Sequence, residues 1–466
     1  MQRPLTLLPS ISQGLADFAI RAGADFPALA RERAVDAITD CIGCMLAGAS
    51  EPVASVVKAV VPTVLNGVRL VGGDAHASPA DSALLHGTLA HALDFDDTNH
   101  PAYAHPGAVL VPVMLAFAAQ EKLRGADLVS AYIVGFQIFG KLGRALNFEH
   151  YRRGWHATST FGTLAAAAVA ARLLRLDRDR ATAAIGIAAS EASGVRANFG
   201  SMVKPLHAGL AARNGVLAAL LAQAGMTASA DALDHAHGFI KVFNNGSQPD
   251  LDALADWYAP LEILGENALA LKAYPACGAT HPAIEAAIAL RADIEGKAID
   301  SIIVHATERA FAPLRHVVPH TPLEAKFSMH FCVAAALHDG EVNLATFSQP
   351  SIDDPSIRQL MGKVTMVGDP SLSNQTEFPA RVEVRTVDGA VYERSVALAL
   401  GKPSRWFSKA QLRGKFMDCA RRTLTPGVAA AAFTALQSID RDVAAETVLD
   451  SLFARTAASQ RQTAWG

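Results

Sequence analysis

The stretch TFGTLAAAAVAARLLRL, residues 160–176, decides the fold class of this 466-residue chain. Its apolar residues recur at helical spacing, and its alanines let neighbouring helices approach closely. The composition of the whole chain agrees, because 51% of the residues are hydrophobic but only 6% are aromatic. The apolar mass is therefore mainly Ala, Leu and Val, which is typical of closely packed helices. The sequence predicts a mainly α protein.

The helical pattern runs from about residue 10 to 265 and changes after about residue 270. AIDSIIVHATE (298–308) predicts a strand, and PARVEVRTVDGAVYERSVALALG (379–401) predicts two strands joined at an Asp-Gly turn. Helices are expected at 281–292 and 328–338. At this length one core is insufficient. We expect a discontinuous helical domain of residues 1–267 and 405–466, with a smaller α/β domain, residues 268–404, inserted in it.

Charge and hydropathy exclude several classes of protein. The 41 basic and 44 acidic residues give a net charge of −3 without a charge run, so a nucleic-acid or membrane surface is not expected. The sequence contains no apolar stretch of about 20 residues, and MQRPLTLLPS lacks the features of a signal peptide. We expect a cytoplasmic protein.

The five cysteines, at positions 41, 44, 277, 332 and 419, do not form a disulfide framework. Cys41 and Cys44 make a CxxC pair, but they lie inside a helical pattern and no second pair follows. We interpret them as small core residues and not as redox or zinc ligands.

Four basic residues recur at predicted helix starts. A cation there is unfavourable for the helix itself, because it meets the positive end of the helix dipole. Four such positions in one chain predict a shared pocket of imidazoles, an ammonium group and backbone N–H groups, suited to a ligand with several carboxylates. Thr158 and Ser159 are the expected N-cap residues of the second helix. The four residues are His105, His156, Lys204, with His207 in the same first turn, and His281.

HALDFDDTNHPAYAHPG (91–107) concentrates acids and histidines between apolar stretches. A carboxylate at Asp94 or Asp97 could orient an imidazole and fix its tautomer. Asp96, Asp97 and His100 could equally form the solvated side of a loop. A metal site is credible by residue type, but HExxH, zinc-knuckle, GxSxG and GxGxxG patterns are absent from the sequence. We therefore predict no metal and no cofactor.

The order of six motifs resembles the 2-methylcitrate dehydratase, or MmgE/PrpD, family. The motifs are HALDFDDT (91–98), HPGAVLVPVMLA (105–116), GWHATSTFGTLAAAAVAARLL (154–174), SGVRANFGSMVKPLHAGLAARNG (193–215), LKAYPACGATHPAIEA (271–286) and EAKFSMHFCVAAALHDG (324–340). The resemblance implies a helical domain made from both ends of the chain with an inserted α/β lid domain. It also implies a homodimer without metal or cofactor that acts on di- or tricarboxylates. Family activities include dehydration of 2-methylcitrate, decarboxylation of cis-aconitate and epimerisation of iminodisuccinate. The family's active-site positions fall on Asp94, Thr98, His105, His156, Lys204 and His281.

Two features depart from the family pattern. Phe331 stands where many members have a tyrosine, and HPGAVLVP replaces a motif associated with methylcitrate dehydratases. Both favour epimerisation of an imino- or amino-dicarboxylate over dehydration or decarboxylation, which remain alternatives. A non-catalytic protein that binds organic acids is the alternative from another class.

The predicted mechanism needs cations that stabilise charge next to a carboxylate, together with a base and an acid. We expect His105 and His156 to exchange protons and Asp94 to orient a histidine. Lys204 and His281 are expected to hold carboxylates. The predicted site consists of the catalytic residues His105, His156, Lys204 and Asp94 and the substrate-binding residues Thr98, His207, His281 and Lys272.

Overall fold

The computed structural model describes residues 10–244, 248–372, 378–441, 443–450 and 452. The chain divides into two compact units. Unit 1 contains the residues up to Ala92, Asp96–Leu269 and the segment from Lys409 onward, and unit 2 contains Leu93–Phe95 and Ala270–Ser408. The N-terminal residues 1–9, on which the signal-peptide prediction depends, lie outside the described residues.

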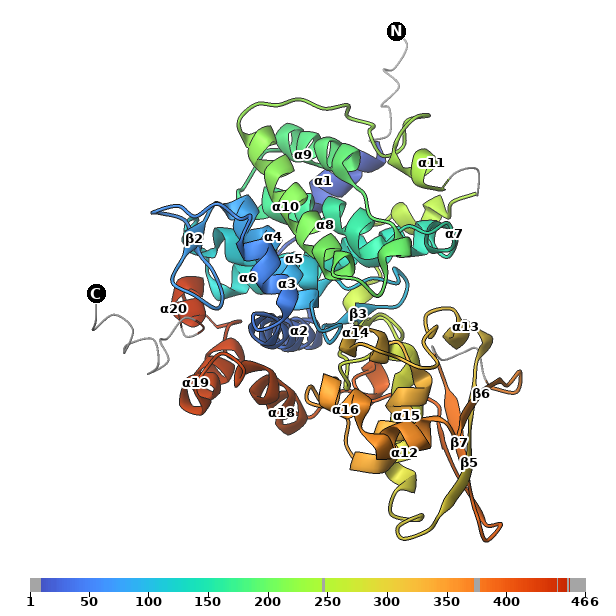
Figure 1. The fold of residues 1–466 in the computed structure, drawn as a ribbon. Coiled ribbons are helices and arrows are strands. Elements are labelled where there is room, and N and C mark those ends of the chain that lie inside the picture. Colours follow the sequence, from blue (N-terminus) through green and yellow to red (C-terminus); the bar gives the residue numbers. More distant parts are fainter. Residues whose placement is uncertain (1–9, 245–247, 373–377, 442, 451, 453–466) are drawn as a thin grey trace, which may run out of the picture. The chain divides into compact units, whose positions relative to one another are not determined.

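Unit 1 is helical (Figure 1), and the predicted mainly α fold is confirmed. Its short strands are β1 (Val68–Arg69), which pairs antiparallel with β2 (His76–Ala77), β3 (Thr98–Asn99), and β4 (Leu269–Ala270) at its boundary. The 3-10 helices are η1 (Arg196–Asn198), η2 (Leu251–Leu254) and η3 (Glu262–Leu264). The α-helices are α1 (Ile11–Arg21), α2 (Ala28–Gly48), α3 (Pro52–Lys58), α4 (Pro79–His91), α5 (Gly107–Ala118), α6 (Gly125–Leu146), α7 (Glu149–Arg152), α8 (Ala157–Leu173), α9 (Arg178–Glu191), α10 (Val203–Gln223), α11 (Phe239–Asn244), α18 (Lys409–Ala420), α19 (Pro426–Leu436) and α20 (Ala445–Asp450).

The alanine-rich helix α8 forms the centre of unit 1. Every residue of α8 except Arg172 is buried, and the helix packs against α5, α6, α9 and α10. The Arg172 guanidinium donates to the Ala19 carbonyl (2.9 Å) and to Ser130 Oγ (2.7 Å). A helix that is apolar on all sides is a core helix, which explains why this stretch decides the fold class.

Two glycines allow α4 and α10 to cross closely beside α8. A Cβ atom on Gly87 would lie 2.8 Å from Gly209 Cα, and a Cβ atom on Gly209 would overlap Leu84 O and Thr88 Oγ1. Side chains at this crossing would push the helices apart. The helix starts that carry basic residues depend on this packing, because α10 presents one of them.

Replacing Gly209 with Ala is expected to lower the free energy of unfolding by about 1–3 kcal/mol, since overpacking a close crossing strains both backbones. Gly414 in α18 is the matched control, because nothing lies within 4 Å of a Cβ atom added there. Gly414→Ala should instead stabilise by about 0.5–1 kcal/mol through helix propensity. Urea titrations of both variants measure the difference, and equal effects would contradict the packing argument.

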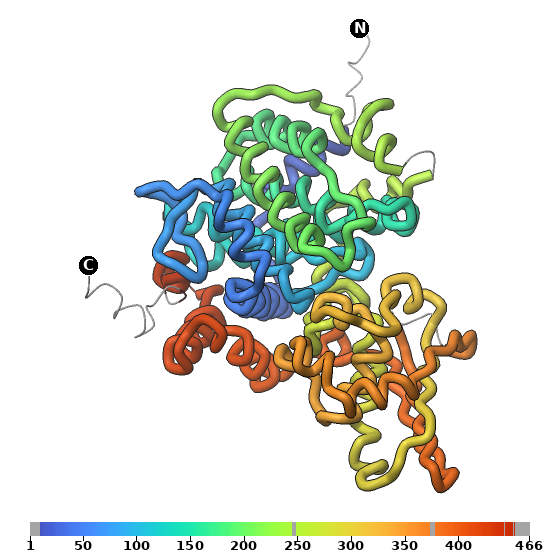
Figure 2. Tube along the Cα trace, viewed as in Figure 1, coloured from blue at the N-terminus to red at the C-terminus, as the bar shows by residue number. Residues whose placement is uncertain are grey.

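The C-terminal segment belongs to the same unit because α18 packs on α2. Figure 2 shows α18 beside α2, at opposite ends of the colour scale. Lys415 Nζ lies 2.7 Å from Asp40 Oδ1, and Lys409 Nζ lies 2.6 Å from Asp36 Oδ1. Asp36 and Asp40 of α2 are thus paired with lysines that lie more than 370 residues later in the sequence.

Unit 2 contains a four-stranded sheet in the order β6-β5-β7-β8. β5 (Ile299–Ala306) runs parallel to β6 (Val364–Gly368) and antiparallel to β7 (Ala380–Thr386), which pairs with β8 (Val391–Val396). The 3-10 helices are η4 (Gly278–Thr280) and η5 (Pro403–Arg405). The α-helices are α12 (His281–Leu290), α13 (Glu308–Phe311), α14 (Pro322–Ala325), α15 (Met329–Asp339), α16 (Gln349–Asp353) and α17 (Pro355–Met361).

Helices α12 and α15 pack against each other and against the sheet. The strands predicted at 298–308 and 379–401 are β5, β7 and β8, with Gly389 at φ 86° in the turn. Strand β6 was not predicted from the sequence. Its VTMVG sequence is short and follows a helix, so it offered only a weak alternation signal.

Cys41 and Cys44 are buried in α2, and burial raises the pKa of both thiols well above the usual range. They are core residues, as predicted. Within the described part of the chain, no single helix is long and apolar enough to span a membrane. Only the bent pair of α2 and α3 passes by length and composition, and α2 is largely buried.

Candidate active site

The predicted site residues fall into two groups, one in each unit. Unit 1 carries Thr98, His105, His156, Lys204 and His207, and unit 2 carries Asp94, Lys272 and His281.

His156 and His207 form a buried pair at the starts of two core helices. His156 is itself the N-cap residue of α8, and His207 lies in the first turns of α10. Their Nδ1 atoms are 3.0 Å apart, so one ring donates a hydrogen bond and the other accepts it. We expected Thr158 and Ser159 to cap α8, but both lie inside the helix.

The histidines of this pair are neutral. Burial lowers the pKa of His156 well below the usual range, and the nearby Lys204 charge lowers it further. Burial and Lys204 also lower the pKa of His207. The sequence suggested a cationic role for each helix-start residue. In unit 1 the described pair instead offers neutral imidazoles, and the positive charge comes from the buried Lys204, the second residue of α10.

His105 lies just before α5, whose N-cap residue is Pro106. Its backbone N–H donates to Thr158 Oγ1 (3.1 Å), which links this turn to α8. Its Nδ1 lies 3.0 Å from the Asp97 carbonyl oxygen and 3.4 Å from Asp96 Oδ2. Both atoms can only accept, so Nδ1 carries the proton and the neutral ring keeps its lone pair on Nε2. With 14% of its side chain exposed, His105 can meet a ligand.

Asp97 is a buried hydrogen-bond centre and not, as considered from the sequence, part of a solvated loop. Its Oδ1 accepts from the Gly107 N–H (2.8 Å), and its Oδ2 accepts from the Tyr132 hydroxyl (2.7 Å). Burial raises the pKa of Asp97 to about 8. The residue therefore fixes the loop that carries His105, and Gly107 is required because a Cβ there would overlap the Asp97 carboxyl group.

Sequence reasoning missed His91 and Asp96 as site residues. His91 ends α4, its ring centroid lies 4.4 Å from that of His105, and its Nδ1 lies 2.9 and 3.0 Å from the two Asp96 oxygens. Both side chains are fully buried. The available signal was the position of Asp96 directly after Phe95 and near Leu93, because a carboxylate set among apolar residues tends to be buried with a partner.

The unit 2 group is organised around Asp94, whose φ of 52° lies in the left-handed region. Lys272 Nζ donates to the Asp94 carbonyl (2.8 Å) and pairs with its carboxylate (2.9 Å). Lys326 Nζ donates to the neighbouring Leu93 carbonyl (2.6 Å). Asp94 was predicted to orient a histidine, and that role remains a prediction. Within unit 2 its carboxylate pairs with Lys272, and within unit 1 Asp96 is a carboxylate hydrogen-bonded to a histidine.

His281 is the first residue of α12, after Thr280, as predicted. Its Nε2 donates to the Ala276 carbonyl (3.2 Å), and Tyr274 packs edge-on at 5.3 Å between ring centroids. Burial, and then the charge of Lys272, lower its pKa to about 3. It is therefore a neutral residue in unit 2, and its predicted role in holding a carboxylate remains a prediction.

His91, Asp96 and His105 are residues of unit 1 that could hold a metal ion, since each offers a ligand atom within 4.8 Å of the others. Their Nδ1–oxygen distances of 2.9–3.4 Å fit hydrogen bonds. We interpret the arrangement as a hydrogen-bonded cluster in which each Nδ1 donates to the carboxylate. The absence of a metal remains a prediction.

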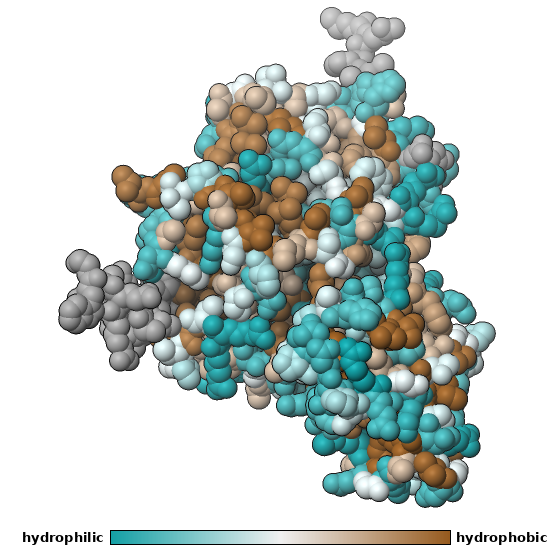
Figure 3. Space-filling view, in the orientation of Figure 1, coloured by the Kyte–Doolittle hydropathy of each residue, from teal (hydrophilic) through white to brown (hydrophobic). Residues whose placement is uncertain are grey.

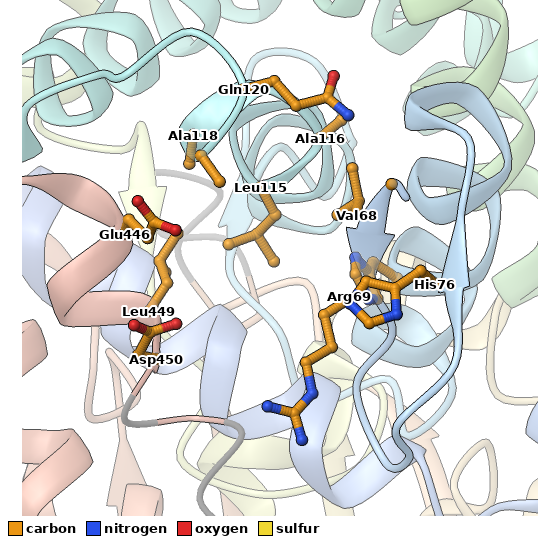
Figure 4. Close-up of a pocket in the computed structure, with 13 residues that line it drawn as sticks. Val68, Arg69, His76, Leu115, Ala116, Ala118, Gln120, Glu446, Leu449 and Asp450 are labelled. Atoms are coloured by element: carbon orange, nitrogen blue, oxygen red, sulfur yellow. The ribbon is translucent and has the colours of Figure 1, made fainter. Parts of the chain in front are cut away.

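A separate cavity of about 300 Å³ in unit 1 does not include the predicted site residues. Figure 4 shows Arg69 and His76 on one side of it and Glu446 and Asp450 on the other. The charged groups there come from β1, β2 and α20, and the described lining contains no imidazole beside a carboxylate. We do not assign the chemistry to this cavity.

Comparison with known proteins gives two matching family models. The MmgE/PrpD N-terminal domain matches residues 13–252, and the MmgE/PrpD C-terminal domain matches residues 274–440. A cis-aconitate decarboxylase of Mus musculus is 28% identical over 391 residues, which cover 79% of this chain and 77% of that protein. A cis-aconitate decarboxylase-like protein of Aspergillus oryzae is 30% identical, covering 81% and 83%. A 2-methylcitrate dehydratase of Cupriavidus necator is 25% identical, covering 84% of each.

Proposed function

The chain belongs to the MmgE/PrpD family, and from this premise we propose that it is an acid–base enzyme acting at a carbon next to a carboxylate of a small di- or tricarboxylate. The observation that carries the proposal is the tautomer of His105. Its Nδ1 proton faces the Asp97 carbonyl and the Asp96 carboxylate, so its Nε2 lone pair is available as a base.

Besides a base, this chemistry needs a positive charge and an acid, and other site residues of unit 1 are suited to supply them. Removing a proton or carbon dioxide next to a carboxylate places negative charge on the substrate, which needs a positive group prepared in advance. Lys204 supplies an ammonium at the start of α10, where the helix dipole adds to its effect. The His156–His207 pair can carry a proton between its two Nδ1 atoms, so it is suited to return a proton to the substrate.

Lyase chemistry is the first candidate reaction, because the relatives compared above are named as decarboxylases and a dehydratase. Epimerisation, favoured from the sequence, is the second candidate. Its support is the presence of two separate proton carriers, His105 and the His156–His207 pair. The argument from Phe331 loses weight, because this side chain is 1% exposed and lies in the core of unit 2 beside Phe347.

We also propose the predicted homodimer. Leu84 of α4 and Leu210, Leu217 and Leu221 of α10 are only partly buried, and Figure 3 shows hydrophobic residues over these helices on the visible face of unit 1. An apolar face of this kind is typical of a protein contact surface. The mass in solution, measured by light scattering, tests this. The cytoplasmic location and the roles of Thr98, Asp94, Lys272 and His281 remain predictions.

Incubation with candidate acids in deuterated water tests the reaction. With cis-aconitate, 2-methylcitrate and aspartate as probes, we expect one acid to be turned over. Release of carbon dioxide identifies a decarboxylase, and growth of an unsaturated product identifies a dehydratase. Deuterium uptake with loss of optical rotation identifies an epimerase.

Calorimetry on the same samples measures whether each acid binds, independently of whether it is turned over. Tight binding of an acid without turnover or deuterium uptake would contradict the enzyme proposal in favour of the non-catalytic binding protein. His86→Gln is a matched control for the preparation, because His86 is a buried histidine of unit 1 whose Nε2 accepts from the Val71 N–H, away from the proposed site.

A further inference from the structure

Asp96 lies between two histidines and has no access to solvent. Its two carboxylate oxygens lie 2.9 and 3.0 Å from His91 Nδ1, and its Oδ2 lies 3.4 Å from His105 Nδ1. The side chains of Asp96 and His91 are both 0% exposed, whereas His105 is 14% exposed. Of these three side chains, that of His105 is thus exposed enough to contact a substrate, and those of Asp96 and His91 are buried.

The carboxylate is ionised in this position. Burial by itself would raise the pKa of Asp96, but the N–H groups that His91 and His105 direct at its carboxylate lower it well below the usual range. An anion fixed 3.4 Å from Nδ1 stabilises the imidazolium that forms when Nε2 takes a proton. It also disfavours the tautomer in which Nδ1 would lack its proton.

His91 holds this carboxylate without competing for the proton. Burial lowers the pKa of His91 to about 3, so the ring stays neutral and acts as an N–H donor. Because its Nδ1 bridges both oxygens, the carboxylate plane cannot rotate freely. The ring also lies 4.4 Å from the His105 ring, which restricts the orientation of that ring.

We propose that Asp96 is a positioning residue that fixes the reacting tautomer of His105 together with the Asp97 carbonyl, which accepts from the same Nδ1, and that His91 is a second positioning residue that holds Asp96. This inference rests on the proposed function for its effect on turnover. Its effect on the tautomer can be measured on the protein alone. The motif HALDFDD (91–97) thus contains His91 and Asp96, and both act through His105, which follows later in the sequence.

The direct test is nitrogen NMR of the histidine side chains in the full chain, with His105→Gln used to assign the His105 signals. In the wild type we expect His105 to carry its proton on Nδ1. In Asp96→Asn, an amide N–H can face Nδ1 and oppose its proton, so we expect the other tautomer to become populated although the Asp97 carbonyl still accepts from Nδ1. An unchanged His105 tautomer in Asp96→Asn would overturn the proposal.

Turnover provides a second test with a readout that a purely structural role would not change. Asp96→Asn is expected to lower kcat about 10²- to 10⁴-fold with little change in KM, by analogy with other residues that orient a catalytic histidine. A loss confined to kcat separates a positioning role from a disturbed substrate site, which would also raise KM. Full kcat, or a lower kcat with an equally raised KM, would overturn the proposal.

Two further variants separate positioning from folding. His91→Asn keeps a donor near the place of Nδ1 and should retain most of the activity, whereas His91→Leu removes the donor and should lose at least 10-fold in kcat. Equal activities would count against the role of His91. Asp369→Asn is the matched control, since it removes a carboxylate 3.6 Å from His305 in unit 2 and should leave kcat unchanged. If the wild type turned over none of the acids, the proposed function would fail, while the NMR result would still decide the tautomer.

Discussion

His105→Gln is expected to lower kcat about 10²- to 10⁴-fold, with the fold intact, because general acid–base catalysis contributes about this factor. His105 Nε2 is the lone pair left available when Nδ1 donates to the Asp97 carbonyl. Glutamine can keep the hydrogen bonds of the loop but cannot exchange a proton at neutral pH. Steady-state kinetics on the substrate identified in deuterated water measures the loss, and circular dichroism checks the fold.

The control for this variant is the same substitution at His86. That ring is fully buried in unit 1, and its pKa is lowered to about 3 by burial and the charge of Lys58, so it does not titrate near neutral pH. His86→Gln should keep kcat within about two-fold. Near-normal turnover in His105→Gln would remove His105 from the mechanism and with it the main support for the proposed chemistry.

The second large effect concerns stability. Lys415→Met is expected to lower the free energy of unfolding by about 3–5 kcal/mol at pH 8, since it leaves a buried carboxylate without its cation. The pair is 2.7 Å apart, with 5% of the Lys415 side chain and 1% of the Asp40 side chain exposed. Urea unfolding at pH 5 and pH 8 measures the change.

The pH dependence follows from Asp40. Burial raises its pKa to about 6, although Lys415 opposes this rise. An acid whose pKa is raised by folding binds its proton more tightly in the folded state. Its contribution to stability is therefore fully present below the unfolded pKa and is lost as the pH rises through about 6. Without Lys415 the carboxyl group should be protonated at pH 5, so the deficit of Lys415→Met should be smaller at pH 5 than at pH 8.

A double variant distinguishes the lost ion pair from lost packing. Lys415→Met with Asp40→Asn leaves no buried charge, so it should recover much of the stability and lose the pH dependence. A deficit below about 1 kcal/mol in the single variant, or one that is equal at both pH values, would contradict the buried-pair argument.

Local features of the chain were predicted well because their causes are local. The spacing of TFGTLAAAAVAARLLRL makes α8 a helix wherever it is placed, and the Asp-Gly turn joins β7 to β8 through two adjacent residues. His281 begins α12 because Pro282 suits the first helical turn. The N-cap of α8 was misplaced to Thr158 and Ser159, since the backbone before a helix is set by neighbours such as Gly194, whose carbonyl accepts from the His156 N–H.

The order of the six motifs was enough to indicate the MmgE/PrpD family, and residue type indicated a site rich in histidine and lysine. The protonation of that site could not be predicted in the same way. A pKa depends on burial and on charges that distant segments bring together. His156 is neutral because α8 is a core helix and because Lys204 lies nearby on α10, and neither fact can be read from the residues around His156.

By itself, the sequence determined the mainly α fold, the approximate positions of the helices and the types of side chain available for chemistry, because periodicity acts over a few residues. Only the tertiary structure decided which carboxylate serves which partner. Asp96 and Asp97 look alike in HALDFDDT, yet Asp96 bonds to His91 and Asp97 to Tyr132, 35 residues away. The physical reason is that a buried charge must be matched by whichever groups the packing of helices places within hydrogen-bond distance.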